Sequence, residues 1–191
     1  MLDHLRSSIS GHEYDLVNSE LPNSAVLVAL TNCNSEPEVL LTRRAKHLSR
    51  NPGEVCFPGG KWEEDDASLL ATALRESHEE VGLLPEWVDV VGGLKPIVAR
   101  SNLNVVPYVG IIDTNLDLQP TSDELDSVFR APLRYFMDEK NISPYLHKFN
   151  GQEFSFPGFV YEGYTIWGLT AYIIVDMVNS VYDAGVEMAI R

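Results

Sequence analysis

One segment near the middle of the chain constrains the fold most, because it contains a full set of helix signals between two strand-like regions. Residues 67–81 (ASLLATALRESHEEV) are predicted to form a helix, with Asp65 or Asp66 as its N-terminal cap. Gly82 stands where a left-handed residue commonly ends a helix, and Pro85 prevents continuation. The helix therefore has definite limits at both ends.

Apolar and β-branched runs on both sides of this helix predict strands. The predicted strands cover residues 24–31, 38–42, 88–94 and 104–113, and the first two are expected to form a hairpin. Because strands precede and follow the helix without regular alternation, the pattern favours an α/β fold, with a mixed β-sheet sandwiched between helices, over a doubly wound parallel sheet.

The remaining segments give weaker signals. Residues 1–22 are polar and predicted to be irregular, and residues 43–60, which are basic and then Gly/Pro-rich, predict a loop. Pro107 indicates an edge or a bulge in its strand, and residues 168–181 predict a second helix. The chain shows no repeat and no linker, so residues 1–191 are expected to form a single domain.

The predicted helix has two different faces. An apolar stripe is expected to face the core at four positions, namely Leu70, Leu74, Ser77 and Val81. On another side, Glu76, Glu79 and Glu80 fall within a sector of about 100°. Like charges at these spacings repel, and a hard divalent cation would turn that repulsion into ligation. The alternative is an ordinary solvated face.

Two neighbouring features favour the cation. Arg75 can orient a carboxylate through its guanidinium fork. Gly59 and Gly60 permit a backbone carbonyl or amide to approach a metal ion or a phosphate closely.

At this point the residues resemble a known family. Residues 57–83 (FPGGKWEEDDASLLATALRESHEEVGL) are similar to the Nudix box of hydrolases that cleave nucleoside diphosphates linked to another moiety. The second half, residues 75–83, fits the box position by position. In the first half, Asp66 stands where the general box has Glu, and eight residues instead of seven separate it from Arg75.

That longer spacing, with Glu63 and Asp66 after the two glycines, resembles the coenzyme A diphosphatase subgroup. The subgroup signature upstream of the box is also present, as residues 40–45 (LLTRRA) and 53–60 (GEVCFPGG). One position differs, because Ser49 stands where the subgroup has Arg, with an arginine directly after it. The resemblance covers roughly residues 25–175 as the core of a Nudix domain.

The resemblance implies metal-dependent hydrolysis of the diphosphate bond of coenzyme A and its thioesters, giving 3′,5′-ADP and 4′-phosphopantetheine or its acyl derivative. It implies Glu76 and Glu80 as ligands of Mg²⁺ or Mn²⁺, helped by a backbone carbonyl of Gly59 or Gly60.

The remaining roles concern proton transfer and phosphate binding. Glu79 is either a further ligand or the base that activates water, and Glu124 is the alternative base. Arg75 is a catalytic residue through the carboxylates it orients. Three arginines, Arg43, Arg44 and Arg50, are expected to bind the substrate phosphates. The aromatic residues Tyr161, Tyr164 and Trp167 are either part of the core or a stacking surface for a base.

Charge and composition exclude other partners. With 28 acidic and 14 basic side chains the net charge is −14, which argues against nucleic acid and anionic membrane surfaces as partners.

The sequence indicates a soluble intracellular protein. It has two cysteines, no secretory segment and no apolar run as long as the ~18 residues of a membrane span. The cytoplasm is the expected compartment. A peroxisome is the alternative, although residues 188–191 are not a Ser-Lys-Leu type signal. The expected partner is a small-molecule substrate, and the sequence leaves monomer and homodimer open.

Two other functions remain open. The chain can be a Nudix hydrolase of another nucleotide diphosphate, such as ADP-ribose, NADH or a dinucleotide, against which the Leu-Leu-Thr signature argues. It can also be a binding module that keeps the fold without catalysis, although no carboxylate of the box is lost.

Overall fold

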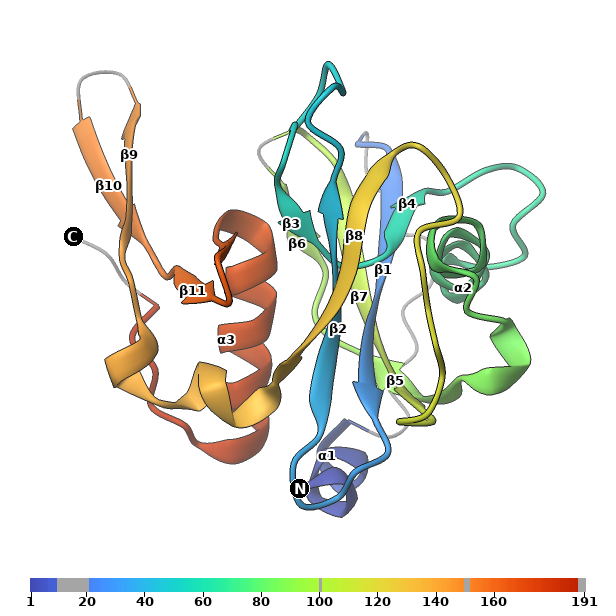
Figure 1. Cartoon of the computed structure of the whole chain (residues 1–191), viewed down its shortest axis with the longest axis horizontal. Coiled ribbons are helices and arrows are strands. Elements are labelled where there is room, and N and C mark those ends of the chain that lie inside the picture. The colour runs from blue at the N-terminus through green and yellow to red at the C-terminus, as the bar shows by residue number, and fades with distance from the viewer. Residues whose placement is uncertain (10–20, 100, 150–151, 189–191) are drawn as a thin grey trace.

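The structure is a computed structural model, and it describes residues 1–9, 21–99, 101–149 and 152–188. A mixed β-sheet lies at its centre, with α2 on one face and α3 on the other (Figure 1). The sheet strands are β1 Asn23–Thr31, β2 Glu38–Arg44, β3 Val55–Cys56, β4 Gly59–Lys61, β5 Asp89–Gly93, β6 Ile97–Val98, β7 Asn104–Ile112 and β8 Leu125–Pro132. The helices are α1 Leu2–Ile9, α2 Leu69–Val81 and α3 Gly168–Tyr182. The predicted fold class is confirmed.

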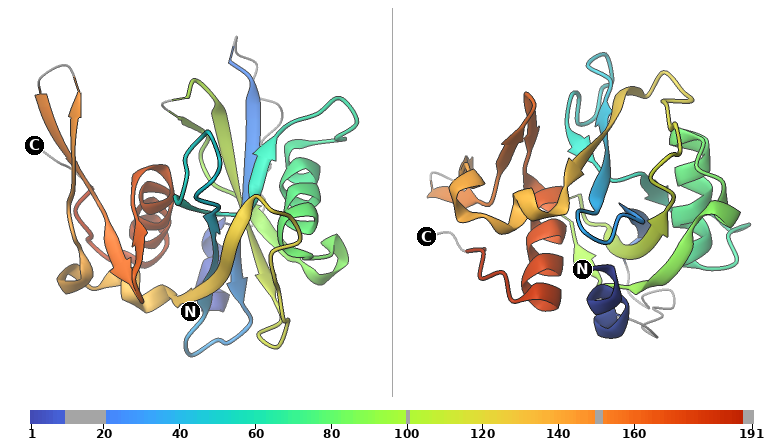
Figure 2. Two further views of the ribbon diagram at one scale, coloured as in Figure 1. Left: turned by 45° about the horizontal axis from the view of Figure 1, so that its top comes forward. Right: turned by 60° about the horizontal axis from the view of Figure 1, so that its bottom comes forward.

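Two further pairs of strands stand apart from this sheet. They are β9 Tyr145–Phe149 with β10 Gln152–Phe156, and β11 Phe159–Tyr161 with β12 Tyr164–Ile166. Three short 3₁₀ turns complete the structure, at Pro85–Trp87, Leu133–Met137 and Glu139–Asn141. Figure 2 shows the β9–β10 hairpin projecting from the α3 side of the molecule.

The sheet is split at one end. β1 runs parallel to β7 over its full length, whereas β1 and β2 have only one registered pair, Leu30↔Val39. The other half of β1 pairs with β4 instead, with Val26 opposite Gly59 and Ala25 opposite Gly60. The expected hairpin of β1 and β2 is therefore antiparallel and paired near its turn, and the two strands diverge where Gly59 and Gly60 lie.

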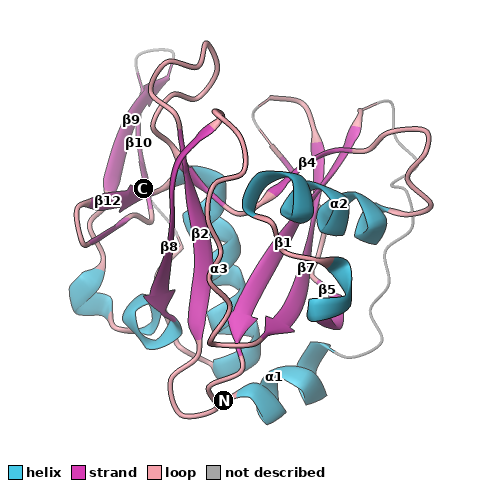
Figure 3. Cartoon of the chain, turned by 45° about the vertical axis from the view of Figure 1, so that its right-hand side comes forward, coloured by secondary structure: helices cyan, strands magenta, loops and turns pink. Residues whose placement is uncertain are grey.

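Side chains of β1 alternate between two cores, as a strand requires. Ala25, Leu27 and Ala29 pack in the cluster that includes α2, and Val28 and Leu30 pack in the cluster that includes α3 and α1. Figure 3 shows α2 lying across β1 and β7 on its own side of the sheet. The same alternation decides which face each residue of β2 occupies.

Two segments are more regular than expected. α1 forms in a stretch predicted to be irregular, because Leu2, Leu5 and Ile9 recur at helical spacing and are buried against the core. The remainder of that expectation, over residues 10–20, lies outside the described residues. The predicted loop 43–60 contains the end of β2, all of β3 and the start of β4. Such short strands depend on their partner strands and leave little signal in their own composition.

Pro107 does not mark an edge, because β7 pairs with β1 on one side and with β5 and β6 on the other. It lies where the partner changes from β6 to β5, and its carbonyl accepts a hydrogen bond from the Leu94 N–H at 2.8 Å. Proline has no backbone N–H to donate, and this is tolerated where the pairing of β7 passes from one strand to another.

The C-terminal helix is confirmed and extends one residue further than predicted, to Tyr182. Among the described residues, no helix is both long enough and apolar enough to span a bilayer.

Candidate active site

The helix α2 begins two or three residues later than a cap at Asp66 or Asp65 would require. Ser68 is the N-cap, with extended backbone angles, and its Oγ accepts a hydrogen bond from the Ala71 N–H at 3.1 Å. Gly82 ends the helix in the left-handed conformation, as predicted, with φ of 71°. The predicted acidic cap was wrong, since the Asp66 carboxylate is occupied by another partner.

The buried face of α2 differs from the predicted stripe. Its buried residues are Leu69, Thr72, Ala73, Ser77, Glu80 and Val81. Leu70 and Leu74 are only partly buried. Ser77 fits the core because its Oγ donates to the Ala73 carbonyl at 2.6 Å. The buried face is therefore rotated so that it includes one of the three glutamates.

The glutamates accordingly differ in exposure. Glu80 is 9% exposed, the Glu76 side chain is 19% exposed and the Glu79 side chain is 56% exposed. A plain solvated face would leave all three in water. The structure instead holds two of them partly or wholly within the protein.

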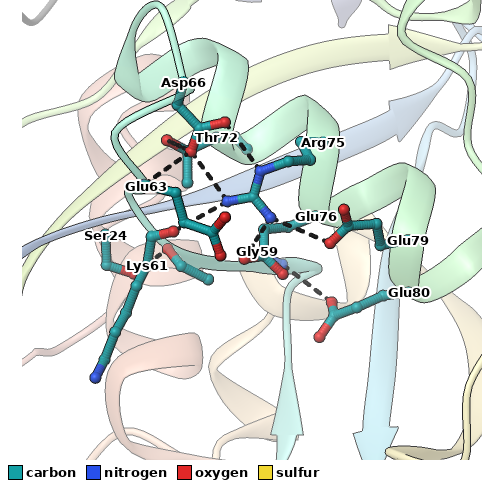
Figure 4. Close-up of polar contacts among 12 residues, drawn as sticks. Ser24, Gly59, Lys61, Glu63, Asp66, Thr72, Arg75, Glu76, Glu79 and Glu80 are labelled. Carbon is teal, nitrogen blue, oxygen red and sulfur yellow. Dashed lines mark hydrogen bonds and ion pairs between the residues drawn. The ribbon is translucent and has the colours of Figure 1, made fainter.

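Arg75 connects these carboxylates to the loop before the helix (Figure 4). Its Nε and Nη2 donate to the two oxygens of Asp66 at 2.9 and 3.0 Å, which is a bidentate pair. Its Nη1 donates to Glu76 Oε1 and to Glu79 Oε2, both at 3.1 Å. Nη2 also donates to the Lys61 carbonyl at 3.1 Å. Arg75 thus fixes two glutamates and one end of β4, in the orienting geometry expected from the sequence.

Asp66 is held firmly in return. The hydrogen bonds from Arg75 lower the pKa of the Asp66 carboxyl to about 2, with support from the Glu63 N–H and the Thr72 hydroxyl. The same pairing raises the pKa of Arg75 further above its usual value. Asp66 therefore acts as a fixed negative partner that holds Arg75 in place.

Glycine is required at positions 59 and 60 because neighbouring atoms lie too close to leave room for a side chain. A Cβ on Gly60 would overlap the Glu76 carboxylate, and a Cβ on Gly59, where φ is 154°, would overlap the backbone of Ala25. The Gly59 N–H donates to Glu80 Oε2 at 3.1 Å. The glycine pair therefore lies against the carboxylates of both Glu76 and Glu80.

Burial perturbs both carboxyl groups. Loss of solvation raises the pKa of Glu80 to about 7, against the opposing effect of the Gly59 hydrogen bond. Burial also raises the pKa of Glu76, although Arg75 opposes the shift. Ionising a buried carboxyl group beside a second carboxylate is unfavourable, and a bound cation would offset that cost. This pair of oxygen donors therefore fits a hard divalent metal ion.

The described residues hold no group of three or more Asp, Glu, His or Cys side chains arranged to bind one ion. A cation here would be held by Glu76 and Glu80 together with backbone oxygen, water and substrate. Magnesium commonly binds in this way, through one or two carboxylates plus substrate phosphates.

Arg44 lies on the same face of the sheet as these carboxylates. Its Nη2 is 3.8 Å from Glu124 Oε2, and its charge partly offsets the raised pKa of Glu80. Its Nε is buried and, within the described part of the chain, has no hydrogen-bond partner. Arg44 therefore has donor capacity beyond its loose ion pair with Glu124.

The other two arginines are placed differently. Arg43, the next residue along β2, points to the opposite face, where its guanidinium lies 5.2 Å from the centre of the Tyr164 ring and its Nε 3.7 Å from Asp126. The structure does not bring Arg43 to the carboxylates, because adjacent residues of a strand point to opposite faces. Arg50 is exposed in the turn between β2 and β3.

The loop between β7 and β8 supplies a contact that the sequence did not indicate. The Thr121 N–H donates to the Glu80 carbonyl at 3.0 Å, and its hydroxyl donates to the Glu79 carbonyl. The Glu124 carbonyl accepts from the Ala45 N–H at 2.8 Å. Thr121 gave no signal in the sequence because its role depends on a contact between segments more than 40 residues apart.

The aromatic residues lie on the α3 side. Tyr164 stacks on Phe129 with ring centres 3.8 Å apart, and Trp167 stacks on Tyr145 at 4.2 Å. Both of these rings therefore have aromatic partners within the protein, and they lie away from the carboxylates of α2.

Comparisons with known proteins point to one family. Residues 21–149 match the NUDIX domain family. The chain is 38% identical over 154 residues to a protein of Enterobacter sp. (strain 638) named "Uncharacterized Nudix hydrolase NudL", covering 81% of this chain and 80% of that one. A Salmonella paratyphi B protein of the same name is equally similar.

Two solved structures share the fold at lower sequence identity. A MutT/nudix family protein from Enterococcus faecalis has a TM-score of 0.57 at 17% identity, covering 90% of this chain and 66% of that one. A C. elegans Ap4A hydrolase has a TM-score of 0.50 at 19% identity, covering 58% of this chain and 80% of that one.

Proposed function

The chain belongs to the Nudix hydrolase family, and we propose that it hydrolyses the diphosphate bond of coenzyme A and its thioesters. The products are 3′,5′-ADP and 4′-phosphopantetheine, or its acyl derivative. The family match supports a hydrolase of nucleoside diphosphate-linked substrates, and the choice of coenzyme A rests on the signature around β2 and β3.

The observation that carries the proposed diphosphate chemistry is the position of Arg44. The Leu-Leu-Thr signature forms the middle of β2, and the arginine two residues after Thr42 lies on the face of the carboxylates, with a partly exposed side chain whose Nη2 is 3.8 Å from Glu124 Oε2. A guanidinium with free donors beside a cation site is suited to the charged oxygens of a diphosphate. Ser49 departs from the subgroup signature, and the adjacent Arg50 is exposed and available to the 3′-phosphate.

We assign Glu76 and Glu80 as the ligands of Mg²⁺ or Mn²⁺, with a backbone carbonyl of Gly59 or Gly60. Nudix hydrolases generally use divalent cations. When bound, such a cation relieves the charge of the diphosphate and lowers the pKa of bound water. The protein's own part is to hold the carboxylates in place, which Arg75 does for Glu76 and the Gly59 N–H does for Glu80.

Glu79 is the proposed base or a further ligand. It is the most exposed of the three glutamates and is anchored by Arg75, so it can accept a proton from water at the surface of the site. Glu124 is the alternative base, held beside Arg44 on the facing loop. Glu79→Gln and Glu124→Gln distinguish the two candidates. The variant of the true base should lower kcat by about 10²-fold or more and still bind the substrate.

The deciding experiment is product analysis. Purified protein is incubated with Mg²⁺ and, in parallel, coenzyme A, dephospho-coenzyme A, ADP-ribose, NADH and Ap4A, and kcat/KM is measured for each. The proposal expects coenzyme A to be preferred, with 3′,5′-ADP as a product and dephospho-coenzyme A markedly poorer. Equal or better cleavage of any of the other three nucleotides would overturn it.

A further inference from the structure

The last turn of α2 carries two of the proposed site residues, although the end of a helix is its least constrained part. The final carbonyl groups of a helix have no hydrogen-bond partners within it. The N–H groups of the two residues that follow α2 donate to the Ser77 and His78 carbonyls, at 3.3 and 3.0 Å. The carbonyls of Glu79 and Glu80 are not reached by these bonds, so their donors must come from another segment.

Thr121 supplies both donors. Its backbone N–H donates to the Glu80 carbonyl at 3.0 Å, and its hydroxyl donates to the Glu79 carbonyl. The carboxylates of the same two glutamates are held by other groups, namely Arg75 for Glu79 and the Gly59 N–H for Glu80. Each glutamate is therefore fixed through both its backbone and its carboxylate, and Thr121 provides the backbone contact.

The loop that carries Thr121 is itself anchored to the sheet. Arg130 of β8 donates through Nη1 to the Thr114 carbonyl and through Nη2 to the Leu116 carbonyl. Leu118 is 8% exposed and packs in the same core as the buried face of α2. Figure 1 shows the loop passing beside α2 before it enters β8. Thr121 therefore joins the end of α2 to a segment that the sheet holds in place.

Beyond Thr121, the same loop reaches the other charged groups of the site. The Glu124 carbonyl accepts a hydrogen bond from the Ala45 N–H at 2.8 Å, and the Glu124 carboxylate lies 3.8 Å from Arg44 Nη2. Because three residues of extended chain span at most ~11 Å, the contact of Thr121 with α2 limits how far Glu124 can move from the last turn of that helix. One short segment thus connects the carboxylates of α2 with the arginine of β2.

We propose that Thr121 is a positioning residue of the active site, which holds the last turn of α2 at a fixed distance from Glu124 and Arg44. This inference rests on the metal-dependent hydrolysis proposed above and applies to any preferred nucleotide. Thr121 acts through the backbone of the helix and not through contact with the substrate. Loss of its hydroxyl would release the Glu79 carbonyl and loosen the arrangement in which the two proposed metal ligands face one cation.

The test removes the hydroxyl and keeps the shape of the side chain. Thr121→Val retains the backbone N–H, and the change leaves no cavity because residue 121 is exposed. A hydrogen bond of this kind changes an equilibrium by about three- to tenfold. The dissociation constant of Mn²⁺, measured by electron paramagnetic resonance without substrate, is expected to rise by about this factor. At saturating Mg²⁺, kcat for coenzyme A should fall by about the same factor, with KM within about twofold.

Two further variants separate positioning from stability. Thr121→Ser keeps a hydroxyl and should restore Mn²⁺ binding and kcat to within about twofold of the wild type. Thr114→Val removes another hydroxyl of the same loop, which donates to Asn32 Oδ1 at 2.8 Å at the other end of the loop. It should lower the melting temperature in chelator about as much as Thr121→Val does, with Mn²⁺ binding and kcat unchanged.

The outcomes separate this inference from the proposed function. Unchanged Mn²⁺ binding and kcat in Thr121→Val, no rescue by Thr121→Ser, or equal losses in Thr114→Val overturn the positioning role and leave the proposed function standing. If the wild type does not hydrolyse coenzyme A, the choice of that substrate fails, and Mn²⁺ binding by the same variants still decides the role of Thr121. A wild type that binds no Mn²⁺ overturns both.

Discussion

The helices α2 and α3 cover opposite faces of one sheet but bury different kinds of side chain. Besides Thr170 at its start, α3 buries a nearly continuous apolar set, which comprises Ala171, Ile173, Ile174, Val175, Met177, Val178 and Val181. α2 buries Thr72, Ser77 and Glu80 among its apolar residues and presents Glu76 and Glu79 beside them. α3 therefore contributes hydrophobic stability, whereas α2 gives up part of that stability to hold carboxylates close together.

This difference shows where function resides in the fold. Every polar group buried on α2 has a partner, such as the Ala73 carbonyl for Ser77 and the Gly59 N–H for Glu80. Such partners reduce the cost of burial without removing it, as the raised pKa of Glu80 shows. The comparison predicts that changes on the two helices separate activity from stability.

Removal of divalent cations should have the largest effect, and only on the α2 side. Activity is expected to disappear in excess chelator and to return with Mg²⁺ or Mn²⁺, because Glu76 and Glu80 are paired carboxylates suited to a hard cation. Far-UV circular dichroism should not change. Full turnover in chelator would contradict the metal assignment.

Glu76→Gln and Glu80→Gln should each lower kcat by at least about 10²-fold, since electrostatic stabilisation of this kind is worth a few kcal/mol. Both variants should fold. For Glu80→Gln, the melting temperature in chelator should equal or exceed that of the wild type, because Gln keeps an acceptor for the Gly59 N–H and removes a buried charge. Near-normal turnover in both variants would show that the two glutamates have no catalytic or metal-binding role.

Ile174→Ala on α3 should give the opposite result. Ile174 is fully buried, and truncation of such a residue costs about 2–5 kcal/mol of unfolding free energy, measured by urea denaturation. The kcat of the folded fraction should stay within about twofold of the wild type, because the residue lies on the other face of the sheet. A loss of kcat as large as that of Glu80→Gln would remove the distinction between the helices.

Asp66→Asn tests the anchor of Arg75. The pKa of Asp66 is about 2 in the folded protein against an ordinary value of 3.8, so its carboxylate contributes about 2 kcal/mol of stability that is present above pH 4 and lost as the pH falls through 2. Wild type should therefore exceed Asp66→Asn in unfolding free energy by about this amount at pH 7, and the difference should shrink below pH 4. Asp65→Asn, at the exposed neighbouring position, is the matched control and should show no such difference.

The smallest expected effect concerns two adjacent arginines on β2. Arg44→Ala should raise KM by about tenfold with little change in kcat, because a charged hydrogen bond to phosphate is worth ~1.5–3 kcal/mol and is made in the ground state. Arg43→Ala should leave KM within about twofold, since Arg43 lies over Tyr164 on the opposite face. Equal effects of the two changes would mean that the substrate reaches both faces of the sheet.

The sequence by itself determined the elements whose signals are local. The end of α2 at Gly82, the four predicted strands, the C-terminal helix and the mixed α/β class followed from periodicity and from helix-ending residues. The proximity of Glu76, Glu79 and Glu80 also followed, because helical spacing fixes which residues share a side. The metal and substrate roles of these residues stay predictions.

The tertiary structure alone decided how each residue is used. Which of Arg43 and Arg44 faces the carboxylates depends on which face of β2 is covered by α2, and the burial of Glu80 depends on where β4 meets the helix. Asp66 resembled a helix cap in sequence and proved to be the partner of Arg75, and Thr121 reached α2 from a distant loop. These contacts join segments far apart in the chain, and their energies arise from burial and charge pairing that no local pattern encodes.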